Sequence, residues 1–296
     1  MESQKVTKER IIFEDLRQTD DLDVERFVHA MLNLQETMQD LDTKQVKATV
    51  TLDEDKPIGL CFWGDWHIGG VGVDYAVFKQ QLQTIAETDG LYVIGMGDYK
   101  DNYLPNIHPA AGLEQIIQPG MQDRVVLHYM SQIGSKTLAL VRGCHDDWDK
   151  KQGDKDFIST CCESAGKAIN FWHGGTLTVN IGSQSYKGHI RHKYKYESSI
   201  NTTNAQRRMM EQFGPADFAA LAHLHNPEAN ERYLMGAYRW LIRSGGNKVW
   251  DEFGQKIGGY KGKPGIPMLI FDPHEHSITG HRDMYSGLDQ LRGKRA

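Results

Sequence analysis

Short segments that combine aspartate or histidine with glycine recur along this sequence. They are Asp65-Trp66-His67, Gly97-Asp98, Gly143-Cys144-His145-Asp146, the histidines of Lys187–His192, and His223-Leu224-His225. Carboxylates and imidazoles together suit manganese, iron and zinc, whereas carboxylates alone suit magnesium or calcium. Each segment by itself is also typical of a turn or an exposed histidine, since Asp and Asn favour turns. Their combination predicts a metal site, in which a carboxylate between two metals can hold them for attack on phosphorus.

Most of these segments follow a short apolar run that we interpret as a strand. The runs are Ile58–Trp63, Leu91–Ile94, Leu138–Val141 and Asp217–Leu221. Strands of α/β sheets deliver side chains at their carboxyl ends, where loops meet at one crevice. We therefore expect ligands that are far apart in the sequence to converge at such an edge.

The two halves of the chain differ in their apolar patterns. In the first half, strands alternate with helices, one of them capped by Asp74. From Gly175 onward, Thr176–Ile181 and Tyr186–His192 alternate like paired strands with a Gly-Ser turn between them. These patterns predict an α/β fold, a four-layer α-β-β-α sandwich of two mixed sheets flanked by helices.

The helical spacing of apolar residues in Asp21–Asp40 predicts a separate element at the start of the chain. We expect residues 1–50 to be an N-terminal helical flank and residues 51–296 to be one enzyme domain. The chain has 296 residues, of which 39% are hydrophobic, enough for a sizeable core. Its net charge of −5 gives no global basic field, so composition does not demand a nucleic-acid partner.

Composition also bears on the compartment. No stretch approaches the roughly 18 to 20 apolar residues of a membrane span. Met1–Ile12 is charged and does not resemble a secretion signal. The four cysteines form no Cys-x-x-Cys pair, which favours a reducing compartment. We expect a cytoplasmic protein with no membrane association, and the sequence leaves its oligomeric state open.

The order of the motifs resembles the calcineurin-like metallophosphoesterase superfamily over residues 57–282. The resemblance is carried by Asp65-x-His67, Gly97-Asp98-x-x-Asp101-Asn102, Gly143-Cys144-His145-Asp146, a lone histidine and His223-x-His225. The local sequence around these motifs is also similar to phosphoesterases encoded by bacteriophages. The resemblance implies the same four-layer fold and two divalent metal ions, with manganese favoured and iron or zinc as alternatives.

The resemblance also assigns a role to each matching residue. The first metal would be held by Asp65, His67 and His225, and the second by His192 and His223, with Asp98 bridging the two. His145 would protonate the leaving group or clamp the phosphate, and Asp146 would orient His145. Asp101 and Asn102 would support the ligands from outside the metal shell.

Cys144 departs from the family pattern, because the residue before the catalytic histidine is normally an asparagine that ligates the second metal. A thiolate at Cys144 would be a softer ligand and would favour zinc or iron. Alternatively, Cys144 is a small buried thiol and the second site is weakened. The lone histidine is also open between His189 and His192, and His192 fits the end of its strand better.

Basic and aromatic residues surround the predicted site. The segment 186–208 includes Arg191 and Lys193, which we expect to bind substrate, although an exposed charged strand pair explains them equally well. A second such stretch begins at Tyr238, and its Gly- and Lys-rich part, residues 244–265, is either a flap over the substrate or an insertion.

We expect a hydrolase that cleaves a phosphodiester in a nucleic acid or nucleotide by attack of a metal-activated hydroxide, as a phosphodiesterase or nuclease does. Its partner would be a phosphate-ester substrate, with DNA, RNA and nucleotides as candidates. Two alternatives remain: a phosphomonoesterase of the same fold, and a non-catalytic scaffold with a degenerate second metal site.

Overall fold

The computed structural model describes residues 24–37, 46–104, 114–153, 156–198, 200–256, 262 and 264–296. Backbone contacts divide the chain into two units, Met1–Gln45 and Val46–Ala296. The described part of the first unit is a helix over residues 24–37. The second unit begins at Val46 rather than at the predicted residue 51, because Val46–Leu52 forms strand β1, which pairs in parallel with β6.

The first sheet of the larger unit has the strand order β12-β11-β2-β3-β4-β5. Its strands are β2 (Ile58–Trp63), β3 (Leu91–Gly95), β4 (Thr137–Leu140), β5 (Ile169–Asn170), β11 (Met268–Phe271) and β12 (Ile278–His281). β2 to β5 run in parallel, and β11 and β12 are antiparallel to their neighbours. Every residue of β2 and β4 is buried, as expected where both faces of a sheet are covered.

The second sheet has the order β1-β6-β7-β8-β10-β9. Besides β1, it contains β6 (Gly174–Ile181), β7 (Gln184–Arg191), β8 (Phe218–Leu221), β9 (Glu228–Leu234) and β10 (Ala237–Arg243). β7, β8 and β10 are parallel, whereas the β6–β7 and β9–β10 pairs are antiparallel. Both sheets are therefore mixed.

The helices of this unit vary in length from one turn to about four. They are α2 (Tyr75–Glu87), α3 (Pro119–Gln132), α4 (Asp147–Gly153), α5 (Phe157–Ser164), α6 (Asn204–Phe213), α7 (Glu252–Lys256), α8 (Met284–Arg295) and the 3₁₀ turn η2 (Gly134–Lys136). As predicted, Asp74 caps α2, since its side chain accepts a hydrogen bond from the Val77 N–H. None of the described helices is long and apolar enough to cross a membrane.

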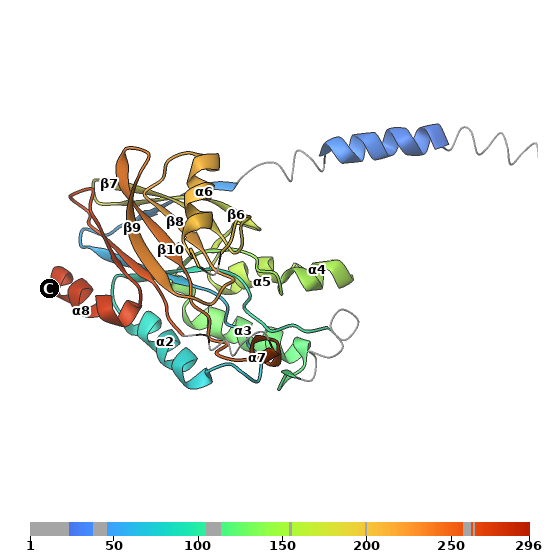
Figure 1. Cartoon of the computed structure of the whole chain (residues 1–296), viewed down its shortest axis with the longest axis horizontal. Coiled ribbons are helices and arrows are strands. Elements are labelled where there is room, and N and C mark those ends of the chain that lie inside the picture. Colours follow the sequence, from blue (N-terminus) through green and yellow to red (C-terminus); the bar gives the residue numbers. More distant parts are fainter. Residues whose placement is uncertain are drawn as a thin grey trace, which may run out of the picture. The chain divides into compact units, whose positions relative to one another are not determined.

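Three apolar clusters lie between successive layers. One joins α2, α3, α5 and α8 to the first sheet, through residues such as Phe78 and Leu288. The second fills the space between the sheets, where Phe62 meets Phe218. The third packs α6 on the outer face of the second sheet through Met209. Helices thus cover both outer faces (Figure 1), and the predicted sandwich of two mixed sheets flanked by helices is confirmed.

Candidate metal centre

The predicted ligands follow the carboxyl ends of strands from both sheets. Asp65 and Asp98 come after the parallel neighbours β2 and β3, and His192 and His223 come after the parallel neighbours β7 and β8. Parallel neighbours end at the same edge of their sheet, so each pair of ligands is brought to one edge. The sandwich then places the two edges together, and the four side chains fall into overlapping clusters.

The backbone turns sharply at these strand ends. Positive φ angles occur at Asp65 (52°), His67 (49°), Asp98 (52°), Asn102 (50°), His223 (71°) and His225 (51°). Ten non-glycine residues of the described part have positive φ, so more than half belong to the candidate site. Asp, Asn and His tolerate this region better than most residues, yet each such residue costs about 1–3 kcal/mol. Strain concentrated in this way is typical of functional sites.

Asp65, His67 and His225 form the first cluster. One potential ligand atom from each residue lies within 4.8 Å of the others. The Nε2 atom of His225 is 3.3 Å from Asp65 Oδ1 and 3.2 Å from His67 Nε2. Burial and the neighbouring His145 lower the pKa of His67 to about 4, which keeps its imidazole neutral, the form that ligates metals.

Asp65, Asp98 and His192 form a second cluster that overlaps the first. His192 directs Nδ1 to the Met96 carbonyl oxygen at 2.8 Å, which leaves Nε2 facing Asp98 Oδ2 at 3.2 Å. Asp65 Oδ1 and His192 Nε2 are buried, and neither has a well-aligned hydrogen bond within the described chain. Donor atoms left in this state fit a bound cation.

The charges of this overlapping cluster depend on one another. Burial alone would raise the pKa of Asp98, but His192 and His145 hold it well below its usual range. Burial alone would likewise lower the pKa of His192, but Asp98 raises it well above the usual value. The Asp65 and Asp98 carboxylates therefore stabilise positive charge in this cluster. A divalent cation would supply that charge.

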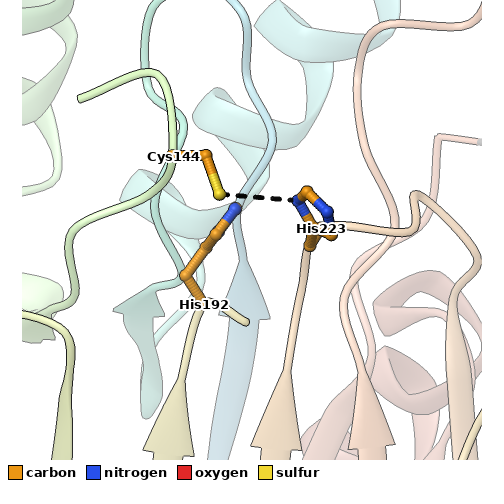
Figure 2. A group of neighbouring side chains, drawn as sticks. All are labelled: Cys144, His192 and His223. Atoms are coloured by element: carbon orange, nitrogen blue, oxygen red, sulfur yellow. Dashed lines mark hydrogen bonds between the residues drawn. The ribbon is translucent and has the colours of Figure 1, made fainter. Parts of the chain in front are cut away.

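Cys144, His192 and His223 form a third cluster, in which three chain segments meet (Figure 2). Cys144 Sγ lies 3.8 Å from His223 Nδ1. Burial and the neighbouring His192 lower the pKa of His223 to about 4, so that this imidazole is also neutral. The thiol points at the histidines instead of entering the core, which supports a ligand set of one sulfur and two nitrogens.

His145 lies beside these clusters, and its surroundings correct one prediction. Its backbone N–H donates to Asp98 Oδ1 at 2.8 Å, and its ring nitrogen Nδ1 meets the Asp101 carbonyl oxygen at 2.5 Å. The predicted orienting group, Asp146, instead accepts hydrogen bonds from the backbone N–H groups of Asp98, Tyr99 and Gly143. Asp146 thus fixes the loops, and the Asp101 carbonyl orients His145.

Asp101 and Asn102 lie behind the clusters and contact His67 and His145. Asp101 Oδ1 lies 3.1 Å from His67 Nδ1, and the Asn102 amide donates to the His145 carbonyl oxygen at 2.8 Å. Sequence reasoning missed Lys248, whose ammonium lies 2.9 Å from the same Asp101 oxygen. Lys248 is only 3% exposed, and its place in a basic, Gly-rich stretch gave no signal of this role.

The first part of the stretch that contains Lys248 does not fit the flap, which was one of the two alternatives for residues 244–265. Asn247 and Lys248 are buried, the Asn247 carbonyl accepts from the Asp74 N–H, and Val249 donates to Gly72. At Gly246, a Cβ atom would lie 2.7 Å from the His225 ring, so only glycine fits. Residues 244–249 are thus a fixed wall of the site, and residues 257–261 and 263 lie outside the described residues.

The remaining predicted residues take separate places. His189 faces the Gly214 carbonyl oxygen at 2.9 Å and the Thr176 hydroxyl at 3.0 Å, which satisfies both ring nitrogens away from the clusters. His192 is therefore the histidine that the strand end brings to the ligand groups. Arg191 and Lys193, the predicted substrate-binding residues, line a cavity that Cys144 and His192 also line.

Comparison with known proteins gives no family assignment. No family model and no curated protein matches the sequence. Similar solved structures include Vps29 from Entamoeba histolytica complexed with Zn²⁺, at 12% identity over 76% of this chain and 97% of that one, with a TM-score of 0.38. Vps29 from Chaetomium thermophilum has 11% identity over 76% and 96%, with a TM-score of 0.41.

The sulfate thiohydrolase SoxB from Thermus thermophilus, in complex with glycerol, has 9% identity over 83% of this chain and 61% of that one, with a TM-score of 0.41. These TM-scores are too low to carry any residue role to this chain. The candidate site is therefore supported by its own geometry.

We expect the chain to bind two divalent metals, because the donor atoms form two outer groups that are linked through the Asp65-Asp98-His192 group. Asp98→Ala should lower occupancy of both positions, whereas His67→Ala should mainly empty one. Elemental analysis after manganese loading and desalting measures this. Less than one metal per chain in the unaltered protein would contradict the prediction, and treatment with a chelator should remove both.

Lys248→Met should weaken metal binding about 10- to 100-fold, the usual effect of losing a group that orients a ligand. The Asp101 carboxylate would lose its cation and hold His67 less firmly. Isothermal titration with manganese, well below the melting temperature, measures the affinity. The matched control is Lys256→Gln, an exposed lysine of α7 paired with Glu252. Equal affinities in both variants would show that Lys248 has no part in the site.

Cys144→Asn should raise manganese affinity, because a neutral amide oxygen is a harder ligand than a thiolate. Cys144→Ala should weaken binding without unfolding the protein. Cys162→Ala, which removes a buried thiol outside the site, is the control. A Cys144→Asn protein with a lower melting temperature and unchanged manganese titration would mean that the thiol serves packing alone.

Proposed function

We propose that this chain is a metal-dependent phosphoesterase that hydrolyses a phosphodiester in a nucleic acid or nucleotide. The observation that carries the proposal is the pair of ligand groups, Asp65-His67-His225 and Cys144-His192-His223, joined through a cluster that contains Asp98. Two divalent cations held there would neutralise charge on the phosphate and lower the pKa of a water molecule. The motif resemblance to calcineurin-like metallophosphoesterases supports the same chemistry.

The surroundings of His145 support a role in proton transfer. Its Nδ1 is engaged with the Asp101 carbonyl oxygen, so Nε2 is the nitrogen that would give a proton to the leaving oxygen. The ring packs against Trp148 at 4.2 Å and against His67 at 4.6 Å between centroids. These contacts hold the imidazole in one orientation beside Asp98.

The thiol of Cys144 bears on the alternative of a non-catalytic scaffold. That alternative depends on a second site lost through the Cys144 replacement. Because Sγ faces His192 and His223, the replacement substitutes one ligand type for another and leaves three donors in place. This supports the enzyme over the scaffold. The basic residues Arg191 and Lys193 beside the same cluster support an anionic substrate.

A substrate panel with added manganese tests the proposal. It comprises bis-(p-nitrophenyl) phosphate, p-nitrophenyl phosphate, cyclic nucleotides, and single- and double-stranded DNA and RNA. Hydrolysis of diesters at rates above those of the monoester is the expected result. Hydrolysis of the monoester alone would favour the phosphomonoesterase, and no turnover by metal-loaded protein would favour the scaffold.

His145→Ala should lower kcat by about 10²–10⁴-fold on a diester with an alkoxide leaving group, the usual range for a general acid. The loss should be much smaller with bis-(p-nitrophenyl) phosphate, since nitrophenolate leaves without a proton. His128→Ala, an exposed histidine of α3, is the control. Full activity of His145→Ala on the alkoxide substrate, with metal content retained, would exclude the proton-donor role.

A further inference from the structure

A cavity of about 350 Å³ adjoins the candidate metal centre. Cys144 and His192 line it, so the cavity shares a wall with the Cys144-His192-His223 cluster. Its other side chains include Arg142, Arg191, Lys193, Lys195, His173 and Asp147. A ligand bound in this cavity would therefore lie next to a phosphate held at the metal centre.

The charge of the lining is strongly unbalanced. Four side chains are cationic, and one, Asp147, is a carboxylate. Asp147 lies 3.6 Å from Arg142 Nη1 and 3.7 Å from His173 Nδ1, both longer than hydrogen bonds. The chain as a whole has a net charge of −5, so this positive lining is a local feature. Such a concave cationic surface attracts anions.

Among the residues that line the cavity, Arg142 gives the strongest indication of an anion-binding site. It is 3% exposed, and Nη2 donates to Asp156 Oδ1 at 2.7 Å. Its Nε and Nη1 atoms are buried and have no hydrogen-bond acceptor among the described residues. Trp172 covers the guanidinium at 4.6 Å and holds its plane. Buried N–H groups normally have acceptors, and a planar guanidinium matches the oxygens of a phosphate.

Three further cations complete the wall. Arg191 is half-buried with its guanidinium 5.2 Å from the Phe213 ring, and its Nε also has no acceptor in the described part of the chain. Lys193 and Lys195 are exposed and line the same cavity, on either side of the buried Tyr194. The lysines can therefore adjust to a ligand, whereas the arginines are held in place.

We propose that this cavity binds a second phosphate group of the substrate, beside the phosphate that is hydrolysed. The inference rests on the proposed function and narrows its substrate to molecules with at least two phosphates close together. Two sources share this chemistry: the adjacent phosphate of a nucleic-acid strand, and the pyrophosphate group of a nucleotide.

The test compares the double variant Lys193→Gln/Lys195→Gln with Lys187→Gln in the full chain. Lys187 is an exposed lysine of β7 that does not line the cavity, so it controls for overall charge. The probes are a fluorescein-labelled phosphorothioate thymidine decamer, followed by anisotropy without added metal, and unlabelled ADP and AMP as competitors. Hydrolysis of bis-(p-nitrophenyl) phosphate is measured in parallel with manganese.

The double variant should bind the decamer or ADP about 10-fold more weakly. The slope of log affinity against log salt should become shallower by about 0.7 for each phosphate that is no longer neutralised by a lysine. Hydrolysis of bis-(p-nitrophenyl) phosphate, which has one phosphate, should fall by a smaller factor than the affinity for the decamer or ADP. A weakening confined to the decamer identifies a strand as the source, and a weakening confined to ADP relative to AMP identifies a pyrophosphate.

Equal weakening in Lys187→Gln and the double variant, or none in either, would overturn the inference. These results are separate from a failure of the proposed function. If the nitrophenyl diester is cleaved but phosphate binding does not change, the cavity proposal alone fails. If no substrate is cleaved but decamer binding falls only in the double variant, the phosphate site stands and the catalytic proposal fails.

Discussion

The candidate site depends on two buried carboxylates that lie close together, because their negative charge must be balanced by positive charge nearby. Asp65 is fully buried and Asp98 is 2% exposed, and both belong to one cluster with His192. Burying an ion costs several kcal/mol unless opposite charge lies close by. Burial would lower the pKa of both His192 and His225, yet the carboxylates raise each one. Positive charge is thus demanded here, and divalent metals would supply more of it than imidazolium does.

Holding so many polar groups at one point also places demands on the backbone. Asp65, Asp98 and His223 reach the site through turns with positive φ. An isolated loop would leave such a strained backbone conformation. The layers of apolar packing resist that relaxation, and a fixed wall at residues 244–249 closes the site. In that wall Gly246 admits the His225 ring, and Lys248 balances the charge of Asp101. Local strain at the site is thus held by packing and pairing elsewhere in the fold.

The sequence was informative where a pattern depends on neighbours in the chain. β2 has the predicted limits, because a continuous apolar run marks a strand that is buried on both faces. Lys248 was missed, because nothing near it in the sequence points to Asp101. The role of Asp146 was wrong for the same reason, since only the folded loops decide which groups its oxygens meet. Motifs identify donors, but three-dimensional contacts decide their partners.

The two sides of the site carry different chemical groups, and this difference would orient a bound substrate. His145 groups with His67 and Asp98, whereas the cationic cavity adjoins Cys144 and His192. A proton donor is useful where the leaving oxygen departs, and cations are useful where phosphate charge is retained. A substrate with two phosphates would therefore bind with its leaving group toward His145 and its second phosphate toward Arg142. A substrate with one phosphate would have no group to place in the cavity, and its orientation would be set by the metal ligands alone.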